Sequence, residues 1–135
     1  MASLQDVRTI ALELPGASER EGRSGFQWRV GERMFVWERT LRPSEIAAFP
    51  GPVPQGPILA AYVEHLGAKE ALLAQPGDTF FTTSHFDGHS SVLVRLDAVA
   101  MDELRELVVE AWLCRAPAKL AREYLTAIEA LEEGP

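Results

Sequence analysis

The sequence predicts an α+β fold: one compact domain in which helices pack on a mainly antiparallel sheet. Its 135 residues suit a single hydrophobic core. Two runs rich in aromatic and β-branched residues, 26–39 and 80–96, each surround a turn signal and are typical of β-hairpins. Amphipathic helical patterns flank them, so the expected order is α-β-β-β-α-β-β-α-α. Residues 1–131 are expected to form the domain, and residues 132–135 a frayed C-terminus.

The first helix is expected to begin at Ser3, whose hydroxyl can cap the first turn, and to end at Pro15-Gly16. Its apolar residues recur at steps of three and four, as a single buried stripe requires: Leu4, Val7, Ile10, Ala11 and Leu14. Residues 17–25 are polar and are expected to form a loop.

The first hairpin is expected to turn at Gly31-Glu32 with a type II′ turn. This register pairs Val30 with Arg33, Trp28 with Phe35, and Phe26 with Trp37. One face would then carry Phe26, Trp28, Val30, Phe35 and Trp37, and the other Gln27, Arg29, Met34, Val36 and Glu38. The aromatic face is expected to lie in the core, and a base-stacking platform is the alternative.

The middle of the chain combines a proline-rich connection with shorter elements. Residues 40–57 hold five of the nine prolines and are expected to form a lid or connector with one helical turn at 44–49. A buried strand at 58–63 and a helix at 64–75 should follow. Helices are also expected at 101–115 and after Pro117, which suits a first helical turn.

The second hairpin contains the sequence H-x-D-x-H, formed by His85, Asp87 and His89. Imidazole and carboxylate groups could bind a small ligand or a divalent metal. A two-residue type I′ turn at Asp87-Gly88 would, however, direct the two imidazoles to opposite faces. The favoured interpretation is that one histidine fixes the hairpin through a hydrogen bond to the backbone or to Thr82, Thr83 or Ser84. No catalytic residue, metal ligand set or cofactor is predicted.

The charge pattern restricts the candidate partners. The net charge is −7, yet residues 1–43 carry seven arginines and six acids, whereas residues 44–135 carry six basic residues and fourteen acids. A surface that contacts phosphates should therefore involve the first third of the chain. The candidate DNA-contacting residues are Arg23, Arg29, Arg33, Arg39, Arg95, Lys119 and Arg122.

Cellular context is inferred from what the sequence contains. No apolar run approaches the roughly 20 residues of a membrane span, and the N-terminus lacks the pattern of a signal peptide. A cytoplasmic location without membrane association is therefore expected. Cys114 is the sole cysteine, which excludes an internal disulfide.

Four segments together resemble the MmcQ/YjbR family. They are FVWERTLRPSE, ILAAYVEHLGAKEALLA, FFTTSHFDGHSSVLVRLD and ELRELVVEAWLCRAPAKLA, in this order. The resemblance implies a compact α+β fold similar to secretion-chaperone-like domains. It also implies a non-enzymatic DNA-binding role in which paired β-hairpins act as wings.

Three functional hypotheses follow. The first is a DNA-binding protein without enzymatic activity that uses both hairpins. The second is a protein-interaction adaptor that uses the open face of the sheet. The third is a small-ligand or metal-binding domain centred on His85, Asp87 and His89. A monomer or a weak homodimer is expected in each case.

Overall fold

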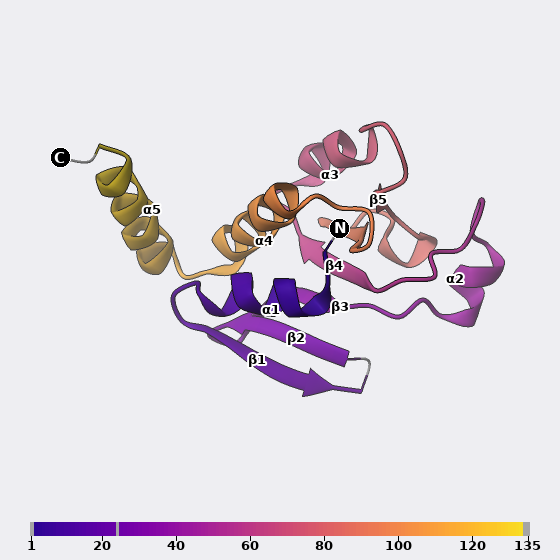
Figure 1. Ribbon diagram of the computed structural model, residues 1–135, viewed down its shortest axis with the longest axis horizontal. Coiled ribbons are helices and arrows are strands. Elements are labelled where there is room, and N and C mark those ends of the chain that lie inside the picture. The colour runs from indigo at the N-terminus through magenta and orange to yellow at the C-terminus, as the bar shows by residue number, and fades with distance from the viewer. Residues whose placement is uncertain (1, 24, 134–135) are drawn as a thin grey trace.

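A six-stranded antiparallel sheet lies at the centre of the computed structural model, which describes residues 2–23 and 25–133. The strand order is β1-β2-β3-β4-β6-β5, and α1 and α4 lie together over one face (Figure 1). The strands are β1 (Ala17–Gly22), β2 (Gly25–Val30), β3 (Arg33–Glu38), β4 (Ile58–Tyr62), β5 (Phe80–Phe81) and β6 (Ser91–Arg95). The helices are α1 (Leu4–Leu12), α2 (Pro43–Ala47), α3 (Leu66–Leu73), α4 (Met101–Arg115) and α5 (Ala118–Glu133), with one 3₁₀ turn, η1 (Ser84–Phe86).

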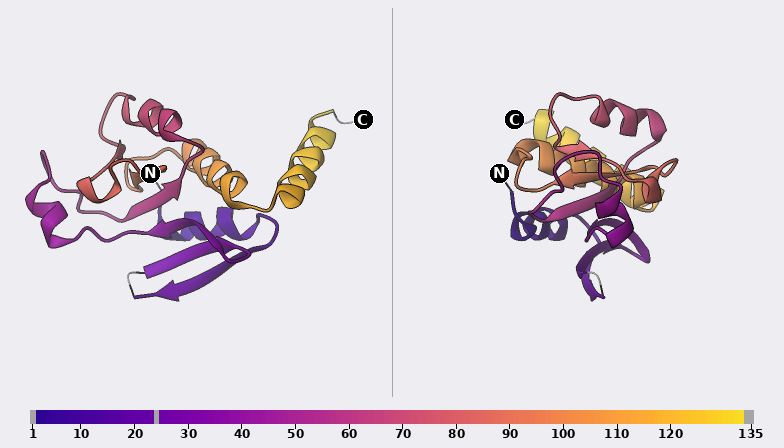
Figure 2. Two further views of the ribbon diagram at one scale, coloured as in Figure 1. Left: turned by 180° about the vertical axis from the view of Figure 1, so that it is seen from behind. Right: turned by 90° about the vertical axis from the view of Figure 1, so that its right-hand side faces the viewer.

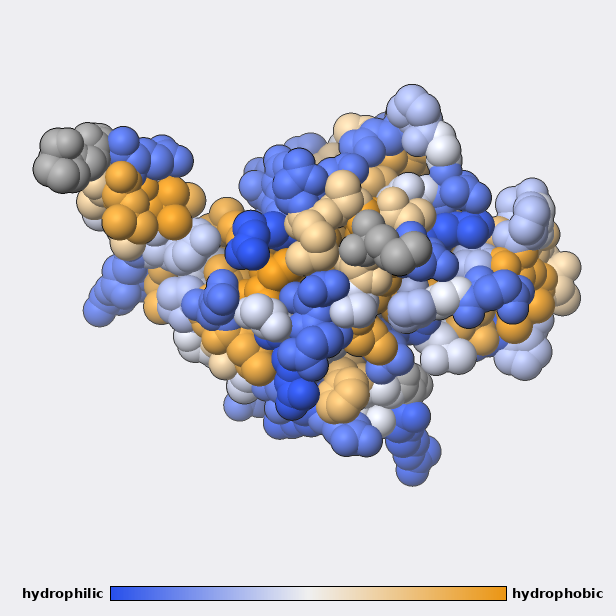
Figure 3. Space-filling view, viewed as in Figure 1, coloured by the Kyte–Doolittle hydropathy of each residue, from blue (hydrophilic) through white to orange (hydrophobic). Residues whose placement is uncertain are grey.

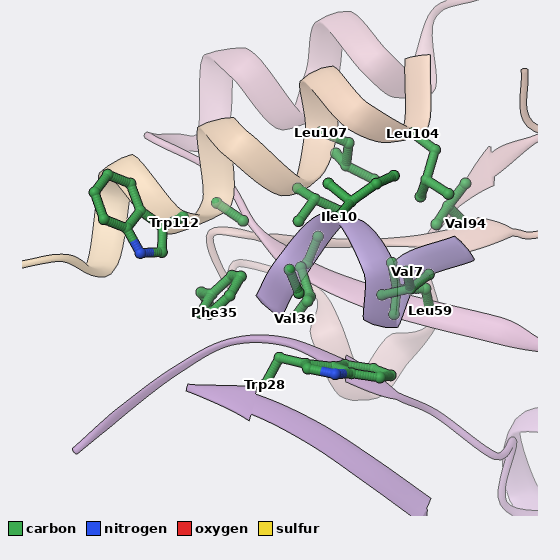
Figure 4. Packing of buried hydrophobic residues seen from close by; sticks show 14 of the residues in the cluster. Val7, Ile10, Trp28, Phe35, Val36, Leu59, Val94, Leu104, Leu107 and Trp112 are labelled. Atoms are coloured by element: carbon green, nitrogen blue, oxygen red, sulfur yellow. The ribbon is translucent and has the colours of Figure 1, made fainter. Parts of the chain in front are cut away.

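The main core lies between the sheet and the pair α1 and α4. Apolar side chains from both helices meet alternate residues of the central strands (Figure 4). The Trp112 ring is fully buried, and its indole N–H donates to the Pro15 carbonyl at 3.1 Å. That bond joins the end of α4 to the turn after α1, so the two helices and the sheet form one α+β domain, as predicted.

Residues 17–25 correct the sequence-based expectation of a polar loop. Residues 17–22 form β1 and Gly25 begins β2, and β1 pairs along its whole length with β2. Glu19 of this strand accepts hydrogen bonds from the Trp28 indole at 3.0 Å and from Arg8 at 2.8 Å. A charged strand of this kind is typical of a sheet edge, where one side stays in water.

The first hairpin has its predicted turn but not its predicted register. Gly31 has a φ of 61°, as a type II′ turn requires, and Val30 pairs with Arg33. Between Trp28 and Arg29 the register shifts by one residue, because β3 contains a bulge. The expected assignment of side chains to the two faces is therefore wrong for two residues. Val36 packs in the main core, and Trp37 lies on the opposite face of the sheet.

The second hairpin is also looser than the sequence suggests. β5 pairs with β6, but residues 82–90 connect them, so the expected two-residue type I′ turn at Asp87-Gly88 is wrong. Asp87 has φ −59° and ψ 129°, and Gly88 has φ 80°. With the His89 N–H donating to the Phe86 carbonyl at 3.0 Å, this is the geometry of a type II turn.

The C-terminal helix α5 projects from the rest of the molecule (Figures 1 and 2). It continues through Glu133, so residues 132 and 133 are helical rather than frayed, while residues 134–135 lie outside the described residues. Within the described residues, no helix is long and apolar enough to cross a bilayer.

Candidate functional site

Among the residues that the structure describes, no long helix lies over the second face of the sheet. The left panel of Figure 2 shows the molecule from this side, with α1 farther from the viewer and above β1 and β2. A smaller core covers its β4–β6 part, where the connection 40–57 and η1 pack over the strands. The buried residues of this core are Leu41, Ile58, Ala60, Phe86 and Leu93. The β2–β3 part of the same face is open to solvent.

A buried carboxylate joins the two segments that cover this face. Glu45 of α2 is 4% exposed, and it accepts hydrogen bonds from the Arg39 guanidinium at 2.7 Å and from the Arg42 N–H at 2.8 Å. Its second oxygen accepts from the Thr83 hydroxyl at 2.5 Å. Burial alone would raise the pKa of this carboxyl, but the hydrogen bonds and the Arg39 charge hold its pKa below the ordinary 4.5. Glu45 therefore fastens α2 to Arg39, which directly follows β3, and to Thr83, which directly precedes η1.

The lowered pKa of Glu45 gives a pH-dependent contribution to stability. A carboxyl with a depressed pKa in the folded state stabilises the fold above its unfolded pKa, and this stabilisation is lost as pH falls through the folded value. We expect the difference in unfolding free energy between the wild type and Glu45→Gln to be constant near neutral pH and to shrink below pH 4.5. Denaturant unfolding over this pH range measures it. Glu13→Gln, at an exposed position, is the control for the loss of a carboxylate, and a gap for Glu45→Gln that does not narrow below pH 4.5 contradicts the expectation.

A buried ammonium holds the connection 82–90 from the other side. Lys69 of α3 is 4% exposed, and its Nζ donates to the carbonyls of Phe86 at 2.7 Å and His89 at 3.0 Å. Burial lowers the pKa of Lys69, and the nearby Asp87 carboxylate opposes that shift. Lys69, rather than a histidine, fixes this hairpin.

The open part of the second face is hollowed into a pocket of about 540 Å³. Side chains of β2 and β3 line it on one side, and the segment 38–43 and η1 line it on the other. We call it the open-face pocket. Its lining residues are Gly25, Gln27, Met34, Trp37, Glu38, Arg39, Thr40, Leu41, Arg42, Pro43, His85 and Phe86.

Three aromatic rings continue this surface as a row, with an arginine at each end. Trp37 lies between Phe86 and Tyr62, with ring centroids 6.4 Å and 5.3 Å away. The Arg39 guanidinium lies 5.1 Å from the Phe86 centroid, and the Arg115 guanidinium lies 4.1 Å from that of Tyr62. These cation–π contacts, and the hydrogen bond from Arg115 Nε to the Met34 carbonyl at 3.0 Å, hold the row in place. The bulge in β3 creates it, because the bulge brings Trp37 to this face.

The three residues of the H-x-D-x-H sequence are exposed but do not form a joint site. His85 lines the open-face pocket, whereas Asp87 lies beside a separate hollow near Phe49. Both His85 and His89 meet the Phe86 ring edge-on. Neither imidazole makes a side-chain hydrogen bond within residues 2–23 and 25–133, so the expected histidine anchor is wrong. In this part of the chain, no group of three His, Cys, Asp or Glu side chains could hold a metal ion.

The structure separates the seven candidate DNA-contacting residues. Arg39 is nearly buried in its ion pair with Glu45. Arg95 pairs with Asp78 at 3.3 Å and lies over Phe81, and Arg29 donates to Gln27 and to the Glu32 carbonyl.

The four remaining candidates are exposed but dispersed. Arg23 lies between β1 and β2, and Arg33 begins β3, so the two arginines lie at opposite ends of β2. Lys119 and Arg122 are exposed on α5, which projects from the body (Figure 2). The structure therefore does not gather the seven candidates into one continuous basic surface.

Sequence reasoning missed Glu45, Lys69 and Tyr62 as parts of this region. One signal was available for Glu45: it stands three residues after Arg42 with Pro43 between, which is typical of a helix start with an acid in the first turn. Lys69 stands between Ala68 and Glu70 on a helix, and a lysine in such a position is usually solvated. Nothing local in the sequence indicates that it reaches carbonyls 17 and 20 residues away.

Fold and site together define the class of protein. It is an α+β domain whose open sheet face carries a pocket and a row of aromatic rings with an arginine at each end. The family model YjbR matches residues 12–114. The chain therefore belongs to the YjbR family, as its resemblance to MmcQ/YjbR proteins suggested.

Similar proteins agree with this family assignment. The uncharacterised proteins Rv2570 of Mycobacterium tuberculosis (strain ATCC 25618 / H37Rv) and Mb2600 of Mycobacterium bovis are 40% identical over 128 residues, which cover 93% of this chain and 97% of each relative. The crystal structure of Deinococcus radiodurans protein DR2400, with a domain of the family model DUF419, superposes with a TM-score of 0.63. It covers 93% of this chain and 89% of that chain at 23% identity, which shows that the fold is shared.

Proposed function

We propose that this YjbR-family chain is a non-enzymatic binding protein that holds a segment of a partner protein in the open-face pocket. The observation that carries the proposal is the row Phe86–Trp37–Tyr62 beside a hollow of about 540 Å³. Tryptophan, tyrosine and arginine are the residues that dominate binding energy at protein interfaces, and methionine is enriched there. An apolar or aromatic side chain of the partner would insert against Met34 and Trp37.

The charges of the pocket favour a peptide over a polyanion. Arg39 is neutralised by Glu45, and Glu38 stands on the rim together with Arg42. The pocket thus has no large excess of cations, and the whole chain has a net charge of −7. Nucleic acids draw much of their affinity from phosphate contacts, which need such an excess.

Duplex DNA is the second candidate, and exposed arginines on the hairpins favour it. Arg23 and Arg33 form no ion pair among the described residues. Phosphate contacts from these two arginines, one at each end of β2, would position a duplex along this strand. DNA binding would depend on Arg23 and Arg33, whereas peptide binding would depend on Met34 and Trp37. Mutation of each pair therefore distinguishes the two candidate functions.

A peptide selection followed by fluorescence titration tests the first candidate. Peptides are selected from a random display library on the immobilised chain, and the best binder is titrated. Trp28 and Trp112 are buried, so a change in tryptophan emission reports mainly on half-buried Trp37. We expect Met34→Ala to weaken binding by roughly tenfold or more, and Trp37→Ala to do the same when it is titrated with a dye-labelled peptide, because this variant lacks the reporting tryptophan.

The matched control is Met101→Ala, which makes the same change at an exposed site on α4 and should leave affinity unchanged. Equal losses for Met34→Ala and Met101→Ala would contradict the proposal. A salt-dependent titration with duplex DNA is the second arm. Binding there that weakens when Arg23 and Arg33 are changed to alanine, with a flatter salt dependence, would favour DNA as the ligand instead.

A further inference from the structure

A second hollow, of about 330 Å³, lies between α3 and α4, on the side of the sheet that α4 covers. We call it the interhelical groove. Its floor is apolar, because Val63, Phe80 and Leu107 belong to the main core and Leu72 packs against that core. A hollow of this volume is large enough to hold a small molecule. It shares no lining residue with the open-face pocket.

Four glutamates line the same groove above its apolar floor. Glu103, Glu106 and Glu110 follow one another on α4 at steps of three and four residues, which places them on one side of the helix. Burial raises the pKa of the Cys114 thiol, and the carboxylates of Glu110 and Glu64 raise it further, so these two lie at the same end of the groove. In Figure 3, hydrophilic surface covers the upper side of α4, next to α3.

The four carboxylates form no ion pair among residues 2–23 and 25–133. The basic residues of the two helices are engaged elsewhere. Lys69 of α3 is buried and donates to two backbone carbonyls of the second hairpin. On α4, Arg105 pairs with Glu13, and Arg115 lies over the Tyr62 ring. The positive charge that would complement the groove must therefore come from a ligand.

We propose that the interhelical groove binds an aliphatic polyamine. Its ammonium groups would pair with the carboxylates, and its methylene groups would lie on Leu72 and Leu107. In such compounds three or four methylene groups separate successive ammoniums, a distance close to one helical turn of about 5.4 Å. Glu103, Glu106 and Glu110 recur along α4 at about the same interval. Charge and apolar surface thus alternate in the groove as they do in the ligand.

The dimensions of the groove favour this occupant over a metal ion or a protein. In the part of the chain that the structure describes, no group of three His, Cys, Asp or Glu side chains could hold a metal ion, so the negative charge suits a cation that is itself spread out. Glu103 and Glu110 are only about 10 Å apart along the helix axis. A protein segment on so short a groove would bury much less than the roughly 1,200 Å² of a standard stable interface.

Isothermal titration calorimetry of the full chain with spermine at low ionic strength tests the proposal. We expect a single site whose affinity falls as sodium chloride is added. Glu106→Gln should weaken binding by roughly fivefold or more, because it removes the central carboxylate of the groove. Glu129→Gln is the matched control, since it removes the same charge from an exposed position on α5 and should leave the affinity almost unchanged.

A second pair of variants tests the groove itself. Ala71→Arg places a guanidinium among the carboxylates and should abolish binding. Ala74→Arg makes the same change at an exposed position just after α3, outside the groove, and should weaken binding far less. Unchanged thermal unfolding of the variants would confirm that the fold is intact. Met34→Ala should leave spermine affinity unchanged, so this proposal and the peptide-binding proposal can fail independently.

Three results would overturn the proposal. The first is the absence of spermine binding at low salt, and a lysine-rich peptide that binds in its place would assign the groove to a protein partner. The second is an equal loss of affinity for Glu106→Gln and Glu129→Gln, because it would indicate general attraction to an acidic surface. The third is competition by magnesium chloride as strong as that of spermine at equal charge, because a compact dication cannot use the apolar floor.

Discussion

Replacement of Glu45 by alanine is expected to lower the free energy of unfolding by about 3–5 kcal/mol. The side chain is the sole carboxylate partner of Arg39 among the described ion pairs, and Arg39 is itself only 10% exposed. Its removal leaves a desolvated guanidinium unpaired and takes the acceptor from the Thr83 hydroxyl. Equilibrium unfolding in urea, followed by circular dichroism, measures the loss.

Glu13→Ala is the control for this change. It removes the same side chain from an exposed pair with Arg105, 3.9 Å apart. Exposed pairs contribute about 0–1 kcal/mol, so this variant should unfold almost like the wild type. Similar losses for the two variants would show that the buried network does not stabilise the fold as its geometry indicates.

Replacement of Lys69 by methionine is expected to cost about 2–3 kcal/mol. Methionine keeps most of the apolar stem but removes the ammonium, so the His89 carbonyl loses its donor and the Phe86 carbonyl keeps only the His89 N–H. The effect should be local as well as global. Amides of residues 82–90 are expected to exchange hydrogen faster than in the wild type, because this connection loses its anchor on α3.

The control is Lys119→Met, at an exposed position of α5. Surface substitutions of this kind usually change stability by less than about 0.5 kcal/mol. The role assigned to Lys69 would be contradicted if Lys69→Met lost equally little unfolding free energy and left amide hydrogen exchange in residues 82–90 unchanged.

The fold could be predicted where side-chain periodicity reports on burial. The expected helix 101–115 coincides with α4, and the stripe of α1 supplies three buried residues, Val7, Ile10 and Ala11. β1 could not be predicted in this way. It is an edge strand with alternating exposure in which Ser18, Arg20 and Glu21 face water, so it lacks the apolar alternation of a core strand. The glycines that flank its turn to β2 were the available signal.

The bulge in β3 explains why the open-face pocket was not foreseen. Pairing outward from the Gly31-Glu32 turn assigns Trp37 to the core face, and one extra residue reverses that assignment. Phe35 and Val36 are neighbours, and both are fully buried. In a regular strand, neighbouring side chains point to opposite faces and could not share one core. The site also depends on pairs far apart in the chain, such as Glu45 and Thr83, which no local pattern connects. The sequence therefore predicts the candidate residues but not which of them meet.

The polar edge of β1 has a consequence for the final size of any assembly. A sheet that grew by adding strands would offer a fresh edge after each addition, and such growth has no natural end. Charged side chains on β1 and the two-residue length of β5 discourage growth at either end of the sheet. Strand addition at these two edges is therefore disfavoured, which should protect a concentrated solution from forming fibres.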